Sequence, residues 1–386
     1  MSQNNWKSTL LWSLIAAAFV GPGTVTTATK AGSEGGWYYV LPLIIAMLAG
    51  FLLMEMAARL TLVTGQTLGA IVSQRLGKGV VYFLFLGVAL GCAAYQAGNL
   101  LGGLAGLQLF LPLQRTWVLA LGLLVAGILW MGSFQRISRA LALVVVLMGV
   151  AFLYTGTQSA LRPPADGFLR FTVTSTTILA LIGTTIVPYN FFLAAGLSPG
   201  QQLKEMRSGL AGSFLIGGLI TLGILLTGVA INNFSQFSEL VEVLNNSIGT
   251  VGGNLVGVGL FAAGFSSAIT APLAAAVAGR TLLAPSEKDS RWQNQGPWFR
   301  LIWLSVLGMG LIVALLDLDI IPVILSAQVV NGFLVPFLAA LVLYLANSRD
   351  LLGEQVNSVW QNLGGGLVLV YITYQSVVKL GSLFLG

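Results

Sequence analysis

Long apolar runs follow one another along the chain, and short polar segments separate them. A helix needs about 20 consecutive apolar residues to cross a bilayer. Eleven runs approach or exceed this length, at residues 9–29, 38–63, 80–111, 116–132, 138–158, 175–197, 209–232, 250–279, 298–316, 320–346 and 363–384. We expect the long runs at 80–111 and 250–279 to be tilted or to extend beyond the membrane. The pattern predicts an all-α membrane protein with eleven transmembrane helices in one transmembrane domain, residues 1–386.

Glycine and proline interrupt the first and the sixth of these runs. The first contains GPGT at 21–24, and the sixth contains GTTIVPYN at 183–190. A proline removes a helical hydrogen bond, and a polar group freed in hydrocarbon must be received by protein or water. Matched interruptions in two halves indicate an inverted-repeat transporter with its binding site at mid-membrane. We therefore predict helix breaks at Pro22 and Pro188, repeats over about 9–158 and 175–346, and an extra helix at 363–384.

Basic residues indicate the orientation of the chain in the membrane. If the N-terminus is cytoplasmic, most of the 18 Lys and Arg fall in cytoplasmic segments, as the positive-inside rule requires. Eleven crossings then place the C-terminus outside. Met1–Trp6 is polar and the first run is long enough to span, so we expect that run to remain as a helix. The predicted location is the plasma (inner) membrane, with the lipid bilayer as partner.

Composition narrows the possible chemistry. The chain is 56% hydrophobic and only 8% charged, which excludes a soluble domain. Its net charge of +6 comes from Lys and Arg scattered between apolar runs, so we do not expect nucleic-acid binding. Histidine is absent and Cys92 is the single cysteine, which removes the usual ligands of zinc, iron and copper. We expect no cofactor and no enzyme activity, because neither a nucleophile–base pair nor an acidic metal motif is visible.

Several stretches resemble the natural resistance-associated macrophage protein (Nramp) family. The likeness covers nearly the whole chain and is carried by GPGT (21–24), AARL (57–60), VTG (63–65), GTTIVPYN (183–190), GFSSAITAPLAA (264–275) and LSAQVVNGFLVPF (325–337). Members of that family import divalent metals together with protons and have a LeuT-type fold. The resemblance therefore implies a 5+5 inverted repeat, broken helices one and six, alternating access and a metal cation as substrate.

The resemblance also assigns substrate-binding positions. The metal-binding Asp and Asn of the family's first break correspond to Gly21 and Thr24, its alanine carbonyl to Thr184, and its Met to Val187. Only the helix-ten Gln is retained, as Gln328. A site of carbonyls, hydroxyls and one amide is a poor match for dehydrated Mn²⁺ or Fe²⁺, which favour carboxylate, sulfur or imidazole. A metal, held at best by Thr24 and Gln328, would be monovalent or largely hydrated.

Neutral residues also replace the groups that move protons in the family. Its third-helix acids correspond to Gln96 and Asn99, and its sixth-helix histidines to Tyr189 and Ala194. Standard proton coupling is therefore not expected. Gln96 and Asn99 serve either in hydrogen bonds between helices, which we favour, or in substrate contact. We count Gly23 and Tyr189 among the substrate-binding residues because they lie within the two breaks.

Three hydroxyls in the eighth run suggest a sodium site. Ser266, Ser267 and Thr270 could bind Na⁺ together with a carbonyl near Gly21, and ordinary helix packing is the alternative role. Sodium coupling is therefore a hypothesis.

Two acid–base pairs have helical spacing. Glu55 and Arg59 lie four residues apart, as do Lys30 and Glu34, so both pairs can lie on one helix face. Structural pairing is the default interpretation. The alternative for Glu55 is a place on the cytoplasmic access path, where it would meet a passing cation.

Three functions agree with these residues. The first is an Nramp-related transporter of a metal cation. The second transports a small non-metal solute, which can be neutral, zwitterionic or anionic because helix N-termini at the breaks carry partial positive charge. The third is a non-transporting sensor or scaffold. The oligomeric state is not predicted.

Overall fold

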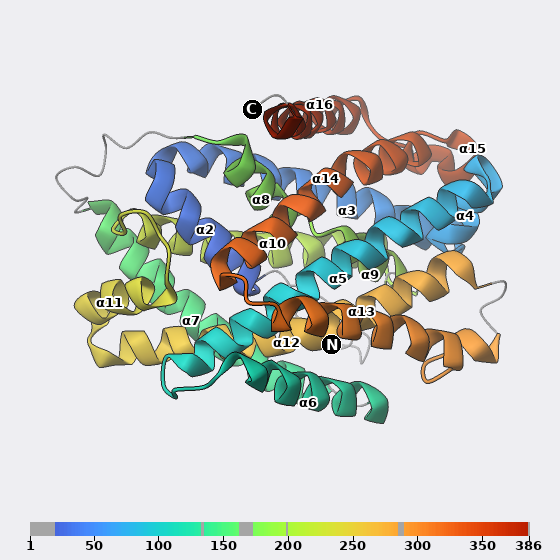
Figure 1. The fold of residues 1–386 in the computed structure, drawn as a ribbon. Coiled ribbons are helices and arrows are strands. Elements are labelled where there is room, and N and C mark those ends of the chain that lie inside the picture. Colours follow the sequence, from blue (N-terminus) through green and yellow to red (C-terminus); the bar gives the residue numbers. More distant parts are fainter. Residues whose placement is uncertain (1–19, 133–134, 162–172, 198–199, 285–288, 385–386) are drawn as a thin grey trace, which may run out of the picture.

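The structure is a computed structural model that describes residues 20–132, 135–161, 173–197, 200–284 and 289–384. Every regular element in these ranges is a helix (Figure 1). The helices are α2 (Pro22–Gly35), η1 (Gly36–Tyr39), α3 (Val40–Thr64), α4 (Leu68–Leu76), α5 (Lys78–Gln108), η2 (Arg115–Trp117), α6 (Val118–Met131), α7 (Gln135–Leu161), α8 (Ser175–Thr185), α9 (Pro188–Leu197), α10 (Leu203–Gly228), α11 (Phe237–Ile248), α12 (Thr250–Leu283), η3 (Ser290–Trp292), α13 (Pro297–Leu315), α14 (Ile320–Ala346), α15 (Arg349–Leu352), η4 (Gly353–Gln355) and α16 (Val359–Phe384).

The all-helical membrane architecture predicted from the sequence is confirmed. The described residues contain nine segments that are long and apolar enough to cross a membrane, and Arg115–Met131 is a shorter apolar helix. One of the nine, Pro22–Thr64, contains both α2 and α3, between which the chain reverses direction at η1 (Figure 1). The exact count of eleven crossings stays a prediction, because residues 9–19 of the first run lie outside the described residues.

Helices α10 and α11 differ from the apolar pattern. Helix α10 begins at Leu203 and ends at Gly228, whereas the sequence predicts 209–232. The first turn of α10 contains the polar residues Lys204 and Glu205. A prediction based on apolar runs leaves such residues out, so it places the start of the helix too late. The pattern also missed α11, a short amphipathic helix whose residues Phe237, Leu240 and Leu244 are buried.

Glycines allow the central helices to approach closely. Helix α12 packs along α5, where a Cβ on Gly264 would overlap the backbone of Gly103 and a Cβ on Gly106 would overlap the backbone of Phe261. Small residues at such contacts are typical of membrane helices, since no hydrophobic force brings helices together within lipid. A glycine also allows α8 to pack closely against α14, because a Cβ on Gly183 would overlap the carbonyl of Gln328. These contacts fix both halves of the site described below.

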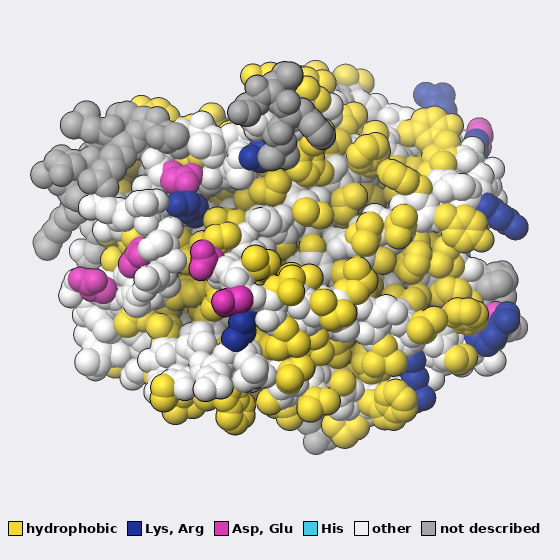
Figure 2. Space-filling view, viewed as in Figure 1, with side chains coloured by type: hydrophobic (Ala, Val, Ile, Leu, Met, Phe, Trp, Pro, Cys, Tyr) yellow, Lys and Arg dark blue, Asp and Glu magenta, His cyan; other side chains and the backbone are white. Residues whose placement is uncertain are grey.

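Charged side chains separate toward the two ends of the molecule. The end that carries α11, here called the α11 end, gathers most of the acidic side chains visible in Figure 2. The opposite end, which carries α4 and α15 and is here called the α4 end, shows mainly Lys and Arg. Such a separation is expected of a membrane protein that obeys the positive-inside rule.

Candidate functional site

The sixth apolar run is broken as predicted. Helix α8 ends at Thr185 and α9 begins at Pro188, with Ile186 outside helical geometry at φ −104° and ψ 72°. Proline has no N–H, so the carbonyl of Thr184 lacks the donor that a continuous helix would supply four residues later. The break therefore frees a backbone oxygen in the centre of the bundle.

At the first break the structure describes the chain from residue 20 onward, which is the side of helix α2. Helix α2 begins at Pro22, and Gly21 before it is extended, with φ −101° and ψ 179°. Proline fits the first position of a helix because its missing N–H would be unpaired there in any case. The Gly21 carbonyl accepts from Val25 N at 3.1 Å. The α2 N-terminus, with its partial positive charge, thus lies at the predicted break.

The structure brings three predicted substrate-binding residues together. The hydroxyl oxygens of Thr24 and Thr184 are 2.9 Å apart, so a hydrogen bond joins α2 directly to α8. Gln328 on α14 packs against the first turn of α2, where a Cβ on Gly23 would overlap its amide group. Thr24, Thr184 and Gln328 are all buried, and Gln328 Oε1 has no hydrogen-bond partner among the described residues. Val187 is also buried.

Two residues at the break were missed by sequence reasoning or given no role. Tyr95 on α5 donates its hydroxyl to the carbonyl of Gly183, and its ring contacts Tyr189 edge-to-face with centroids 5.9 Å apart. Asn190, in the first turn of α9, is fully buried, yet neither atom of its amide has a partner within the described chain. Both residues are polar groups within apolar runs next to predicted site residues, which is the pattern that could have indicated them.

The former proton-pathway position Gln96 bridges helices. Its Nε2 donates to the carbonyl of Ala268 on α12 at 3.0 Å. A Cβ on Gly310 of α13 would overlap the Gln96 side chain, so Gln96 also packs on α13. The favoured prediction of interhelical hydrogen bonding is confirmed for Gln96. Asn99 is buried one turn further along α5.

The three hydroxyls of the suggested sodium site are used in different ways. Ser267 faces the first break, since its Oγ lies 3.1 Å from the place of a Cβ on Gly21. Ser266 donates to the Ala263 carbonyl at 3.1 Å, and Thr270 donates to the Ser266 carbonyl at 2.9 Å. These last two bonds lie within α12.

Glu55 and Arg59, which have helical spacing on the second apolar run, form an ion pair that a third residue joins. Glu55 lies 3.3 Å from Arg59 NH2 and 2.8 Å from Arg207 Nε, and Arg59 also donates to the Gln355 carbonyl and to Asn357. The predicted structural pairing of Glu55 with Arg59 is confirmed. In the described part of the chain no three residues of the types His, Cys, Asp and Glu form a group that could hold a metal.

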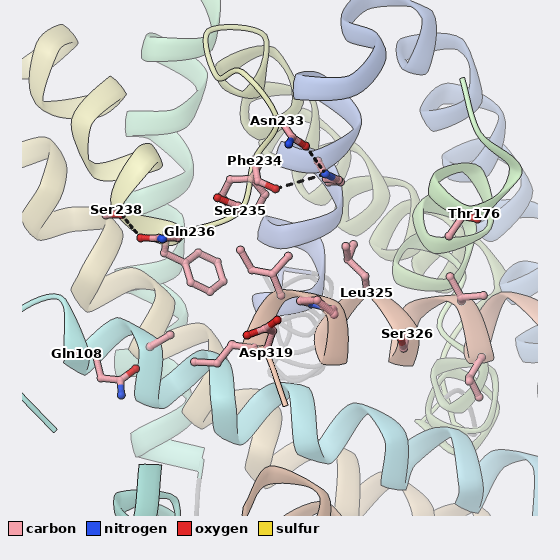
Figure 3. Close-up of a pocket in the computed structure, with 18 of the residues that line it drawn as sticks. Gln108, Thr176, Asn233, Phe234, Ser235, Gln236, Ser238, Asp319, Leu325 and Ser326 are labelled. Atoms are coloured by element: carbon pink, nitrogen blue, oxygen red, sulfur yellow. Dashed lines mark hydrogen bonds between the residues drawn. The ribbon is translucent and has the colours of Figure 1, made fainter. Parts of the chain in front are cut away.

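A pocket of about 1150 Å³ opens near the α11 end, between α2, α5 and α14. Figure 3 shows Asp319 at the start of α14 on one side of it and the segment with Asn233 and Phe234 on the other. Lys30 joins α2 to that segment, donating to Asn233 Oδ1 at 3.2 Å, and forms the predicted pair with Glu34 at 3.3 Å. The described residues of the two breaks do not line this pocket.

The chain is similar in sequence to one family of known proteins. The family model described as "Natural resistance-associated macrophage protein-like" matches residues 13–382. The divalent metal cation transporter MntH 1 of Pseudomonas aeruginosa is 24% identical and the match covers 90% of this chain and 85% of that protein. The divalent metal cation transporter MntH of Mycobacterium tuberculosis is also 24% identical, with coverages of 95% and 89%.

Solved structures show the same fold. A variant of the Eremococcus coleocola manganese transporter superposes with a TM-score of 0.76 at 18% identity, over 99% of this chain and 88% of that one. A transporter of the nucleobase-cation-symport-1 family, in a closed conformation with bromovinylhydantoin bound, superposes with a TM-score of 0.61 at 13% identity, over 98% and 93%.

Proposed function

Since the chain belongs to the Nramp family of membrane transporters, we propose that it carries a metal cation that keeps much of its hydration shell. The relatives named as divalent metal cation transporters support the metal. The observation that carries the proposal is the 2.9 Å contact between the hydroxyls of Thr24 and Thr184. It joins the two breaks at a place where the ligands are neutral oxygens, so the ion meets no carboxylate there.

A neutral ligand set determines which ion is accepted. The available oxygens are the carbonyl freed at Thr184, the two threonine hydroxyls and Gln328 Oε1. Divalent ions normally lose water only where carboxylates compensate for it. An ion at this site therefore enters as a monovalent cation or as a divalent cation with most of its water. Mg²⁺, which dehydrates reluctantly, fits better than Mn²⁺.

The architecture we propose is a single domain of eleven crossings with a 5+5 inverted repeat. The breaks at Pro22 and Pro188 begin corresponding half-helices in the two repeats, as expected of such folds. The charge separation between the α4 and α11 ends supports a cytoplasmic N-terminus and an outside C-terminus in the plasma (inner) membrane.

Transport would not be driven by protons at the third helix. Gln96 cannot change its charge and is held to Ala268, and Asn99 is likewise neutral. Ser267 opposite Gly21 supports sodium as the coupling ion instead. Uptake into proteoliposomes that is unchanged when choline replaces sodium would remove that coupling.

The central test restores one carboxylate. We expect calorimetry on purified wild-type protein to show no heat of Mn²⁺ binding at concentrations where Mg²⁺ binds. Thr24→Asp should bind Mn²⁺, because a charged oxygen then lies beside the Thr184 hydroxyl. Thr24→Ser is the matched control and should behave as wild type. Tight Mn²⁺ binding by wild type, or none by Thr24→Asp, would contradict the proposal.

A zwitterionic or anionic solute is the second candidate. It is favoured by Asn190, whose buried amide has no partner in the described residues, and by the α2 N-terminus at the first break, where partial positive charge favours anions. Uptake assays with Mg²⁺, Mn²⁺ and a panel of organic solutes separate the two. Absence of thermal stabilisation by every tested solute and ion would favour a sensor or scaffold.

A further inference from the structure

A separate pocket of about 680 Å³ lies at the α11 end, between α7 and α11. Helix α11 is amphipathic, with Phe237, Leu240 and Leu244 buried against the bundle. Its opposite face presents polar side chains to the pocket, among them Glu239 and Glu242. The residues that line this pocket are distinct from those of the helix breaks, so the inference below does not depend on the proposed function.

No described residue neutralises the two glutamates. They lie three residues apart on α11 and both line the pocket, and like charges at this spacing repel each other. Glu239 accepts from Ser235 Oγ at 2.8 Å and, through its two oxygens, from Ser235 N at 3.4 and 3.3 Å. These bonds cap the helix start but supply no positive charge. No Lys or Arg is found among the described residues that line the pocket, and neither carboxylate is in an ion pair within the described chain.

The opposite wall supplies an independent observation. Thr155 on α7 lines the pocket and is only 1% exposed, yet its hydroxyl has no hydrogen-bond partner among the described residues. A helical threonine usually satisfies its hydroxyl with the carbonyl four residues earlier, and here that bond is absent. Gln158 on α7 and Asn246 on α11 add amide oxygens to the same lining.

We propose that this pocket binds a hard divalent cation, Ca²⁺, clamping α11 to α7. The donors are all oxygens, two carboxylates with amides and hydroxyls, which is the ligand chemistry of Ca²⁺. An irregular pocket with ligands from two helices suits Ca²⁺ better than Mg²⁺, because Mg²⁺ demands near-ideal octahedral geometry. With only two carboxylates, affinity should fall in the weak range, on the order of 10⁻⁴ to 10⁻³ M.

The test uses the full chain in detergent and Tb³⁺ as a luminescent substitute for Ca²⁺. Tyr154 lines the pocket, so excitation of its ring should sensitise Tb³⁺ emission. Added Ca²⁺ should displace Tb³⁺ and lower this emission. Glu242→Gln and the double variant Glu239→Gln/Glu242→Gln should lose at least tenfold in Tb³⁺ and Ca²⁺ affinity. Tyr154→Phe should lower the emission while it keeps Ca²⁺ binding by calorimetry.

Glu354→Gln is the matched control, since it removes one exposed carboxylate of η4 at the α4 end. It should bind Ca²⁺ as wild type does. Ca²⁺ should also raise the melting temperature of wild type and Glu354→Gln, and not that of the double variant. Equal Ca²⁺ affinity in wild type and double variant, or no Tb³⁺ emission from wild type at millimolar concentration, would overturn the proposal.

Discussion

Two polar clusters in this molecule, both with their centres buried, are built in opposite ways. The charged cluster consists of Glu55, Arg59 and Arg207, and it ties α3 to α10 and to the segment after α15. Glu55 and Arg59 are at most 3% exposed. Each carries a full charge, and each has an oppositely charged partner.

We call Thr24, Thr184, Gln328 and Asn190 the neutral cluster, because each lies in, or packs against, one of the two helix breaks. It carries no formal charge, and within the described chain Gln328 Oε1 and both amide atoms of Asn190 lack hydrogen-bond partners. Burying such atoms without partners costs stability, about 1–3 kcal/mol for each group. Such unpaired polar atoms lower the stability of the fold, but they leave positions where a bound ligand can supply the missing hydrogen bonds.

The difference shows which cluster stabilises the fold and which serves transport. A buried charge without a partner is far more costly than a neutral polar group without one. In the charged cluster each buried charge lies within 3.3 Å of an opposite charge, although Glu55 Oε2 and Arg59 Nε make no hydrogen bond among the described residues. The neutral cluster is incomplete on its own. The intramembrane carboxylate of Glu55 is therefore a structural group, and substrate chemistry is to be sought among neutral oxygens.

The largest expected effect comes from opening the charged cluster. Glu55→Ala leaves the guanidinium of Arg59 buried without its carboxylate, which should cost roughly 3–5 kcal/mol of stability. The melting temperature in detergent and the yield of folded protein should both fall steeply. Asp350→Ala is the control, because its pair with Arg75 at 3.1 Å is largely exposed and should be worth about 0–1 kcal/mol. Similar melting temperatures for the two variants would show that the charged cluster is not a structural anchor.

The sequence predicted the elements whose cause is local. Apolar runs located the membrane helices, and Pro188 with its neighbouring polar residues located the break between α8 and α9. The i,i+4 spacing of Glu55 and Arg59 predicted their ion pair. Each of these features follows from the hydrophobicity or helical geometry of neighbouring residues.

Contacts between segments that are distant in the sequence could be found only in the structure. Arg207 joins Glu55 from 152 positions away, and Tyr95 reaches Gly183 from a different helix, so no spacing rule could connect them. Ser267 faces Gly21 while Ser266 and Thr270 bond within α12, a distinction that depends on the rotation of that helix. Family resemblance supplied the positions Thr24, Thr184 and Gln328, and the structure added Tyr95 and Asn190.

An intermediate effect is expected where the neutral cluster is overpacked. Gly23→Ala places a methyl group where the Gln328 amide now lies, so the amide must move, at a cost of about 1–3 kcal/mol. Substrate uptake should fall at least tenfold because the Gln328 amide is displaced from the first turn of α2. Gly212→Ala on α10 is the control, since its Cβ meets no atom within 4 Å.

The double variant Gly23→Ala/Gln328→Ala sharpens this prediction. If the clash with Gln328 is the cause, the double variant should recover stability relative to Gly23→Ala while uptake stays low, which is a coupling between the two positions. Equal uptake by Gly23→Ala and Gly212→Ala would show that Gln328 does not belong to the substrate site.

The smallest effect is expected at the edge of the neutral cluster, for Tyr95→Phe. The variant keeps the ring contact with Tyr189 but removes the hydroxyl that satisfies the Gly183 carbonyl, at a cost of about 0.5–1.5 kcal/mol. The freed carbonyl lies beside that of Thr184 at the C-terminal end of α8, where partial negative charge favours cations. Cation affinity in calorimetry should therefore rise, by less than tenfold, while the melting temperature falls slightly.

Tyr374→Phe, on the exposed face of α16, should change neither quantity. Weaker cation binding in Tyr95→Phe would instead mean that the tyrosine hydroxyl itself contacts the ion, and the neutral cluster would then have to include α5.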